Sequence, residues 1–247
     1  MSELSVSVVV PVFNSEPTLG ELHHRTASAL DSTDGVGPWE LIFVNDGSLD
    51  GSWERIAALA TEHPEVRGLD LARNFGQHNA LLAGIHATGH EVIVTIDDDL
   101  QDRPEDIPRL LAALAPDVDI VYGKPLAKRR SLYRRVATRV VRTANVLGMG
   151  RISLDIGGFR AFRASLLEGV GPHQGDRLAL DTLLAPSARR HAVVRVQHEP
   201  RRHGSSNYTF GMLVGHTLTE LRSVRPGNAN GSADRSYVVR RTAGTAS

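Results

Sequence analysis

The sequence predicts an α/β fold, a mostly parallel, doubly wound sheet with helices on both faces. Two observations support this fold class. Apolar, β-branched runs typical of buried strands alternate with helix-like segments over the first 120 residues. The chain has 247 residues, of which 41% are hydrophobic, and this is enough for one domain with a full core. The glycine-rich fingerprints of dinucleotide-binding and P-loop folds are absent from the sequence.

Apolar runs and boundary residues place the elements of the first half. A strand that Pro11 stops precedes a helix that Ser15 or Thr18 can cap. A loop rich in Gly, Asp and Ser then leads to the second strand, and Pro104 suits the first turn of the last helix. The predicted strands are 5–12, 39–45, 66–70, 92–96 and 119–122, and the predicted helices are 16–30, 52–62, 80–88 and 104–114.

The second half has a different character. Residues 128–147 repeat apolar side chains at helical spacing with six arginines between them, which predicts a basic amphipathic helix. This pattern suits a helix at a membrane surface and an ordinary surface helix packed on the sheet about equally. Strands are expected over 155–162 and 193–198, helices over 176–186 and 210–222, and a disordered tail over 226–247.

The fourth predicted strand ends directly in three carboxylates. Asp97, Asp98 and Asp99 follow a short β-branched run, and Gln101 comes two residues later. Parallel sheets bind ligands outside the carboxyl ends of their strands, so Asp-x-Asp at this position indicates a site for a hard cation. By the same rule, one crevice should be formed by residues 11–14, 45–48, 70–77 and 97–101.

The net charge of zero conceals a division along the chain. Residues 1–120 hold 21 acidic and 6 basic side chains, whereas residues 121–247 hold 7 and 22. The basic half is therefore expected to face an anionic partner such as phosphate or a lipid headgroup. Its arginines lack the interleaved aromatic residues of a single-strand nucleic-acid platform, so no nucleic-acid partner is expected.

The compartment expected from the sequence is the cytoplasm. The absence of cysteine excludes a disulfide framework, a thiolate nucleophile and a zinc–thiolate site, and it suits a reducing environment. No signal peptide is evident, and no apolar run approaches the roughly 20 residues that a membrane-spanning helix needs.

A polar loop near the end of the second half could bind phosphate. Arg201, Arg202 and Ser206 lie close to Gly204, and arginines with hydroxyls beside a glycine form a natural phosphate clamp. A solvated loop is the alternative interpretation.

With these pieces placed, the sequence resembles glycosyltransferase family 2, the inverting nucleotide-sugar transferases with a GT-A fold. The resemblance spans roughly residues 5–222 and is closest to polyprenyl-phosphate glycosyltransferases, such as dolichyl-phosphate mannose synthase, bactoprenol glucosyltransferase and undecaprenyl-phosphate formamidoarabinose transferase. The segments that carry it are VVVPVFNS, LIFVNDGSLDGS, RNFGQHNALLAGI, IDDDLQDRPEDIP, DIGGFRAF and RRHGSSNYTF.

The resemblance implies a role for each matching residue. Asp97 and Asp99, with Gln101, would hold Mg²⁺ or Mn²⁺ against the donor diphosphate, and Asp98 would lie beside the nucleotide. The base and ribose pocket would be lined by Pro11, Phe13, Asn45 and Asp46, the nucleotide would lie near Arg73 and Gln77, and the acceptor phosphate would be gripped by Arg201, Arg202 and Ser206.

Three departures from the family pattern matter. Asn45 stands where the subgroup commonly has a base-reading aspartate, and Asn207 stands where the acceptor motif usually has lysine. Many members continue into membrane-spanning helices, whereas this chain ends in a polar tail, as in mannose synthases that rely on membrane partner subunits.

The expected domain is 1–225, with a nucleotide-sugar half over 1–122 and an acceptor half over 123–225. We expect a glycosyltransferase peripheral to the inner face of the membrane, using a UDP-sugar in preference to a GDP-sugar and a polyprenyl phosphate acceptor. A soluble hydroxyl acceptor is the alternative, and it would need a general base, for which Asp155 and Asp181 are the candidates. A non-catalytic sugar-nucleotide-binding subunit is the second alternative.

Overall fold

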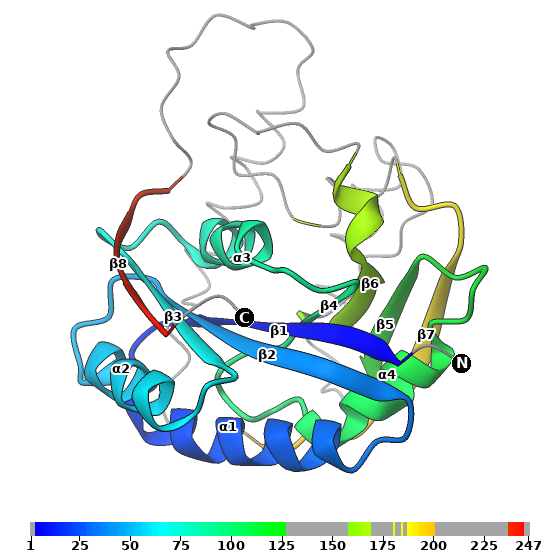
Figure 1. The fold of residues 1–247 in the computed structure, drawn as a ribbon, viewed down its shortest axis with the longest axis horizontal. Helices are drawn as coiled ribbons and strands as arrows, with labels where there is room; N and C mark the ends of the chain where they lie inside the picture. The colour runs from blue at the N-terminus through cyan, green and yellow to red at the C-terminus, as the bar shows by residue number, and fades with distance from the viewer. Residues whose placement is uncertain are drawn as a thin grey trace, which may run out of the picture.

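The computed structural model describes residues 3–126, 158–168, 180, 184, 187–200 and 237–244. The described strands form one eight-stranded sheet of order β7-β5-β6-β4-β1-β2-β3-β8 (Figure 1). Four of its seven strand pairs are parallel, so the predicted α/β class with a mostly parallel sheet is confirmed. The strands are β1 Leu4–Val12, β2 Val36–Asn45, β3 Val66–Leu71, β4 Val92–Thr95, β5 Ile120–Pro125, β6 Arg160–Arg163, β7 His191–Val196 and β8 Val239–Ala243.

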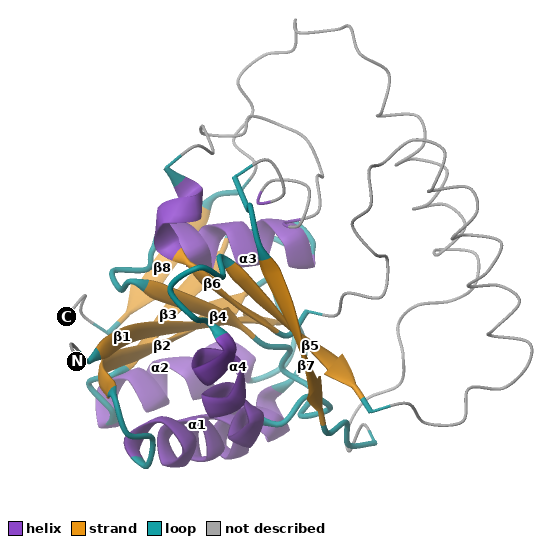
Figure 2. Ribbon diagram, turned by 90° about the vertical axis from the view of Figure 1, so that its right-hand side faces the viewer, coloured by secondary structure: helices purple, strands orange, loops and turns teal. Residues whose placement is uncertain are grey.

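Helices cover both faces of the sheet. Figure 2 shows α1, α2 and α4 on one face and α3 on the other. One buried cluster lies under each layer: Leu19, Ile56 and Leu110 belong to the first, and Leu81 and Ile85 to the second. The helices are α1 Glu16–Asp31, α2 Ser52–Glu62, α3 Gln77–His86 and α4 Ile107–Ala113, with 3₁₀ turns η1 Pro104–Asp106 and η2 Ala164–Leu167.

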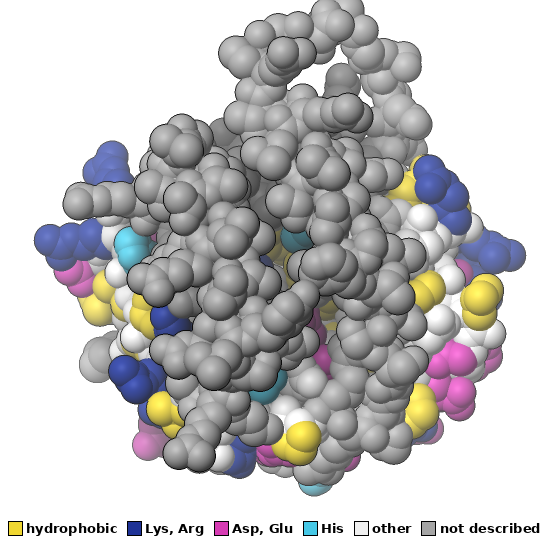
Figure 3. Space-filling view, turned by 180° about the vertical axis from the view of Figure 1, so that it is seen from behind, with side chains coloured by type: hydrophobic (Ala, Val, Ile, Leu, Met, Phe, Trp, Pro, Cys, Tyr) yellow, Lys and Arg dark blue, Asp and Glu magenta, His cyan; other side chains and the backbone are white. Residues whose placement is uncertain are grey.

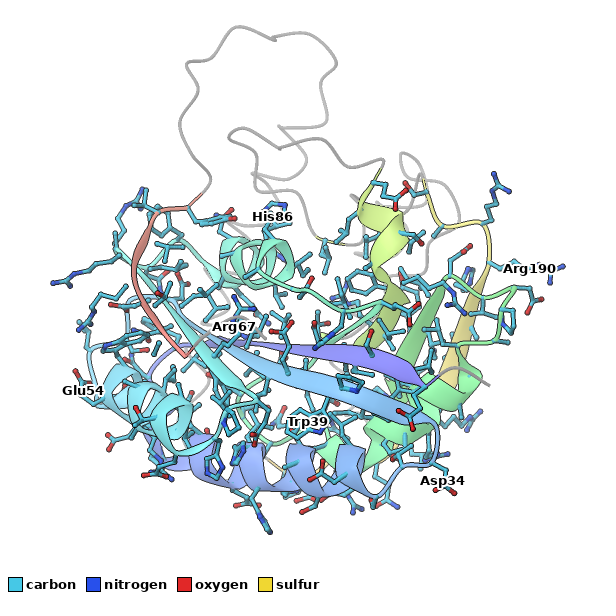
Figure 4. All side chains as sticks on the ribbon, in the orientation of Figure 1. Asp34, Trp39, Glu54, Arg67, His86 and Arg190 are labelled. Atoms are coloured by element: carbon cyan, nitrogen blue, oxygen red, sulfur yellow. The ribbon has the colours of Figure 1, made fainter. Side chains whose placement is uncertain are left out.

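The central strands are apolar because both of their faces are covered. Val8, Val9 and Val10 in β1 are fully buried, as are their partners in β2 and β4. A continuous β-branched run of this kind is what a two-sided core requires. Trp39 of β2 lies toward α1, and its indole nitrogen donates a hydrogen bond of 2.8 Å to Asp31 Oδ1 (Figure 4).

Two strands are antiparallel to their neighbours. β6 lies between β4 and β5 and pairs with both in the antiparallel sense. β8 pairs in the same way with β3 at the edge of the sheet. The prediction of a disordered tail over 226–247 is therefore wrong for the five residues of β8. These residues form a strand because they pair with the edge of β3, and their polar sequence does not show this.

Several expected elements differ from the structure or lie outside its described part. The helix expected over 104–114 begins as the 3₁₀ turn η1 and becomes α-helical at Ile107, because a second proline follows at position 108. Leu180 and Leu184, within the helix expected over 176–186, are helical and buried. The helices expected over 128–147 and 210–222 lie outside the described residues.

The described surface carries charges of both signs. Figure 3 shows lysine, arginine, aspartate and glutamate side chains around the rim of one face, with apolar side chains scattered among them. In the part of the chain that the structure describes, none of the helices has the length and apolar character needed to cross a bilayer.

Candidate functional site

Polar side chains follow the ends of four neighbouring parallel strands. Phe13 follows β1, Asn45 ends β2, Asp70 lies near the end of β3, and Asp97 follows β4 shortly after its last residue. These strands pair in parallel, so their carboxyl ends share one edge of the sheet. The structure thus brings the four segments expected to form a crevice to the same edge.

Four aspartates form the acidic centre of this edge, and we call Asp97, Asp98, Asp99 and Asp102 the carboxylate cluster. Burial first, and then the charges of Asp99, Asp102 and Asp98, raise the pKa of Asp97 to about 7 against the opposing charge of Arg160. Mutual repulsion among neighbouring carboxylates is relieved when a cation binds between them. The cluster therefore has the oxygen donors and the excess negative charge that a hard divalent cation requires.

Each member of the carboxylate cluster is oriented by the surrounding loops. Gln77 Nε2, at the start of α3, donates a hydrogen bond of 2.8 Å to Asp97 Oδ1. The backbone N–H of Gln101 donates to Asp99 Oδ1 at 3.0 Å, and Leu100 adopts a left-handed conformation with φ of 58° to allow this tight turn. The strained backbone at Leu100 therefore helps to hold the Asp99 carboxylate in place.

Asp98 faces a different loop from its neighbours. Its carboxylate accepts the backbone N–H of Phe13 at 3.0 Å, and its carbonyl accepts the Thr18 hydroxyl at 2.7 Å. These two bonds tie the end of β4 to the start of α1. Phe13, which is 38% exposed, lies at the surface beside them, whereas Pro11 is buried within β1. Of the four residues expected to line the base and ribose pocket, Pro11, Asn45 and Asp46 are buried and only Phe13 has an exposed side chain.

The two residues that end β2 make separate contacts. Asn45 Nδ2 donates to Asp70 Oδ1 at 2.7 Å, and Asn45 Oδ1 accepts the backbone N–H of Ser48 at 3.3 Å. The buried carboxylate of Asp46 accepts the backbone N–H groups of Phe75 and Gly76 at 2.7 and 2.9 Å. Asp46 therefore holds the loop that follows β3 against the end of β2.

The environment of Asp46 changes its acidity. Burial raises the pKa of Asp46, while the two backbone N–H groups and the charge of Arg73 act in the opposite direction. Arg73 also lies over the ring of Phe75, with 4.1 Å from its guanidinium carbon to the ring centroid. The Arg73 guanidinium is thus held beside Asp46 by its contact with the ring of Phe75.

Glycine at position 47 is required by the close approach of the two loops. Gly47 has φ of 68°, and a Cβ atom there would lie 2.5 Å from the backbone nitrogen of Asn74. Any side chain would push the loop after β3 away from Asp46. The Asp-Gly dipeptide therefore fixes both the position and the carboxylate partner of this loop.

β8 contributes an arginine to the same region, beside Asn45 and Asp70. Arg241 donates two contacts to Asp70 Oδ2, at 2.8 Å from Nε and 2.7 Å from Nη2. Its guanidinium carbon also lies 4.7 Å from the ring centroid of Trp53 on α2. Asp70 thus links Arg241 to Asn45, and this link could not be predicted because β8 itself was not expected.

The sequence analysis did not identify Asp102, a member of the carboxylate cluster, or its neighbour His198. His198 Nδ1 lies 3.3 Å from Asp102 Oδ1, and the two residues form an isolated antiparallel bridge. Burial raises the pKa of Asp102, and the hydrogen bond and charge of His198 oppose this. Asp102 is the fourth carboxylate of the run DDDLQD, which was a visible signal for it, whereas His198 had no such signal in the sequence.

Gly158 lies directly against the carboxylate cluster. Its carbonyl accepts the Thr95 hydroxyl at 2.5 Å, and a Cβ atom at position 158 would lie 2.6 Å from Asp97 Oδ1. We expect Gly158→Ala to displace the Asp97 carboxylate and lower metal-dependent activity at this site by about 10- to 100-fold, the range found when a metal ligand loses its correct orientation. Steady-state rates at several Mn²⁺ concentrations would measure this. Gly89→Ala is the control, because a Cβ atom there meets nothing within 4 Å.

Some predicted site residues cannot be placed. Asp155, Asp181, Arg201, Arg202 and Ser206 lie outside the described residues. Their expected roles remain predictions.

Comparison with known proteins agrees with this geometry. The family model described as glycosyl transferase family 2 matches residues 7–171. Undecaprenyl-phosphate 4-deoxy-4-formamido-L-arabinose transferase from Yersinia enterocolitica is 35% identical over 213 residues, covering 85% of this chain and 64% of the relative. The protein of that name from Pseudomonas paraeruginosa is 36% identical over 228 residues, covering 88% of this chain and 66% of the relative. The chain thus spans about two thirds of the length of these relatives.

Solved structures share the fold at lower sequence identity. Glucosyl-3-phosphoglycerate synthase from Mycobacterium tuberculosis, in complex with Mn²⁺, UDP-glucose and phosphoglyceric acid, superposes with a TM-score of 0.62 at 22% identity, covering 90% of this chain and 78% of that one. The mannosyltransferase PcManGT from Pyrobaculum calidifontis, with GDP-mannose and Mn²⁺, gives 0.61 at 21% identity, covering 93% and 67%. The expected GT-A type of fold is confirmed.

Proposed function

The chain belongs to glycosyl transferase family 2, and from this we propose that it is an inverting, metal-dependent glycosyltransferase that moves a sugar from a nucleotide donor to a polyprenyl phosphate. The observation that carries the proposal is the carboxylate cluster at the carboxyl edge of the sheet, next to Asn45 and Asp46. Acidic oxygens for a cation and a polar corner for a base lie together there. The names of the relatives support the acceptor, since each describes an undecaprenyl-phosphate transferase.

The donor is bound between the carboxylate cluster and the corner formed by Asn45 and Asp46. Asp97 and Asp99, with Gln101, would hold Mg²⁺ or Mn²⁺, which would supply positive charge to offset the negative charge on the leaving diphosphate. Gln77 orients the Asp97 carboxylate through its hydrogen bond. Mn²⁺ with UDP-glucose in the mycobacterial neighbour supports both the metal and the nucleotide sugar, and a UDP-sugar is the proposed donor.

The acceptor is a phosphate monoester at the membrane surface. Its second pKa is about 6, so the attacking oxygen is ionised at neutral pH and needs orientation instead of a general base. Arg201, Arg202 and Ser206 supply that orientation, and the basic half of the chain faces the anionic headgroups of the cytoplasmic leaflet. The acceptor oxygen attacks the anomeric carbon from the face opposite the nucleoside diphosphate, which inverts the configuration. A membrane partner subunit is part of this proposal.

A transfer assay tests the proposal directly. Labelled UDP- and GDP-sugars are incubated with the full chain, Mn²⁺ or Mg²⁺ and polyprenyl phosphate in detergent, and the label is partitioned between organic and aqueous phases. Label in the organic phase that is lost with a chelator supports transfer to lipid and identifies the donor. Binding of the nucleotide sugar with neither transfer nor hydrolysis would overturn the proposal in favour of a non-catalytic binding subunit.

A second acceptor class is favoured by one residue. Asn207 occupies the position where the acceptor motif usually carries lysine, so one phosphate-directed charge is missing. Transfer to a soluble hydroxyl acceptor, with Asp155 or Asp181 as general base, would suit this loss. In the partition assay, release of nucleoside diphosphate that depends on an added sugar or polyol acceptor, with all label aqueous, would support this alternative.

The phosphate clamp can be tested by a single variant. We expect Arg201→Ala to raise the KM for polyprenyl phosphate about 10-fold or more, because a charge-assisted hydrogen bond of roughly 1.5–3 kcal/mol is lost, while the KM for the donor changes little. Initial rates with each substrate varied in turn would measure both constants. Arg189→Ala, at an exposed arginine, is the control, and a change confined to the donor KM would contradict the clamp.

A further inference from the structure

A second cluster of metal-binding side chains lies away from the donor site. His23 comes from the middle of α1, His63 caps the C-terminal end of α2, and Glu65 immediately precedes β3. β3 runs from this point toward Asp70, so the two sites lie at opposite ends of the strand, roughly 16 Å apart at the rise of a β-strand. We call these three residues the His-His-Glu cluster.

The potential ligand atoms of the cluster converge. His23 Nε2 lies 3.0 Å from Glu65 Oε1, and His63 Nδ1 lies 3.8 Å from the same oxygen. One ligand atom from each residue lies within 4.8 Å of the other two. Zinc binds imidazole nitrogen and carboxylate oxygen at about 2.0–2.2 Å, which places tetrahedral ligands roughly 3.3–3.5 Å apart. The observed separations bracket this value, so small side-chain rotations suffice to close the site.

We propose that the His-His-Glu cluster binds a borderline divalent cation such as Zn²⁺, with water at the fourth position. Two imidazoles and one carboxylate favour Zn²⁺, Co²⁺ or Ni²⁺ over the hard cations that an all-oxygen site selects. Among the described residues no other group of three histidine, aspartate or glutamate side chains converges so closely. At the carboxylate cluster, by contrast, the donor diphosphate supplies further oxygens.

The backbone around the cluster is fixed before any cation binds. The N–H of His63 donates to the Leu59 carbonyl at 2.9 Å, and the N–H of Val66 donates to the His63 carbonyl at 3.0 Å. The carbonyl of Glu65 accepts the N–H of Leu41 in β2 at 2.8 Å. Two of the three ligands therefore sit on a turn locked between α2 and the sheet, which is the rigid support that a metal site needs.

The charges around the cluster also suit a cation. Glu65 places a carboxylate oxygen beside both imidazoles, and a bound metal ion would take the place of the imidazole hydrogen between His23 and Glu65. Glu62 Oε2 lies 4.0 Å from His63 Nε2, where an outer carboxylate can orient the metal-binding ring.

Bound metal would join two helices on one face of the sheet to a strand of the sheet. α1 and α2 lie side by side on that face in Figures 1 and 2, and the cluster would connect both of them to the start of β3. The cation would act as a structural clamp, since a ligand that binds only the folded state stabilises it. This role is independent of the proposed sugar transfer.

Zinc binding to the full chain tests the proposal. Zn²⁺ is titrated against a chromophoric chelator, with excess Mg²⁺ present to occupy the all-oxygen site. We expect one high-affinity Zn²⁺ per chain and a rise in Tm on binding. His63→Ala should weaken the affinity for Zn²⁺ by more than the ~10- to 100-fold expected when a group that only orients a metal ligand is removed. Glu65→Gln should weaken it to a similar extent. His63 is only partly buried, so its removal leaves the core intact.

The neighbouring histidine provides the matched control. His24 is exposed on α1 next to His23, and His24→Ala should keep both the Zn²⁺ affinity and the Tm rise of the unaltered chain. Equal Zn²⁺ affinity in His63→Ala, Glu65→Gln and His24→Ala would overturn the proposal and leave a hydrogen-bonded cluster without a metal role. Comparing the Tm of each variant without Zn²⁺ separates lost ligation from lost folding.

Discussion

Replacing Asp99 with asparagine is expected to lower metal-dependent sugar transfer by roughly 10²–10³-fold, the cost of removing one well-placed group that stabilises developing charge. The Asp99 carboxylate is held by the backbone N–H of Gln101 in a strained turn, so its position is built for a ligand. Asparagine keeps the shape of the side chain and removes the charge that the cation needs. Initial rates across a Mn²⁺ titration would show whether kcat, the metal requirement or both have changed.

The control for this substitution is an aspartate of no expected catalytic role. Asp34 is exposed in the turn between α1 and β2 (Figure 4), and Asp34→Asn should leave both transfer and the Mn²⁺ requirement unchanged. Thermal unfolding of both variants would show that the fold is retained. If Asp99→Asn transferred sugar at the normal rate, Asp99 would no longer be a candidate metal ligand.

Replacing Arg241 with alanine is expected to destabilise the protein by about 2 kcal/mol, because Asp70, only 3% exposed, would lose its charged partner. This is less than the cost at a fully buried pair, since the Arg241 side chain is 47% exposed. For a chain of this length the Tm should fall by roughly 4–8 °C. The donor KM should also rise, because Asp70 orients Asn45 at the end of β2.

Arg240 supplies a control within the same strand. It is exposed and adjacent in β8, so Arg240→Ala removes an equal charge and leaves the contact with Asp70 in place. We expect Tm and donor KM close to those of the unaltered chain. Equal losses in the two variants would mean that general charge on β8, and not the Arg241–Asp70 contact, supports the corner.

The fold could be predicted from sequence wherever a strand is buried on both faces. β1, β2, β3 and β4 were located to within about three residues because their apolar runs end at Pro, Asn or Asp. The antiparallel place of β6 between β4 and β5 could not be predicted, since strand order depends on the whole sheet. β8 was missed for a related reason: this edge strand has the sequence VRRTA and is exposed along most of its length, so no buried face creates a pattern.

The site was predicted in part for the same physical reasons. Strand-end carboxylates such as Asp97 and Asp46 could be found because parallel strands bring their ends together. Asp46 was expected to line the base and ribose pocket, and its contact with the N–H groups of Phe75 and Gly76 was not foreseen. Arg241 and Gly158 act on the site through contacts between residues distant in sequence, and a local motif contains no such information.

The pairing of β8 with β3 has a consequence for biosynthesis. Asp70 and Arg241 are separated by 171 residues, and the ribosome makes roughly 5–20 residues per second. A nascent chain therefore carries the edge of β3 without β8, and Asp70 without its arginine, for about 10–30 s. During that interval the exposed edge can pair with other chains. Production of this protein should consequently benefit from slower initiation or from chaperones that shield strand edges until synthesis is complete.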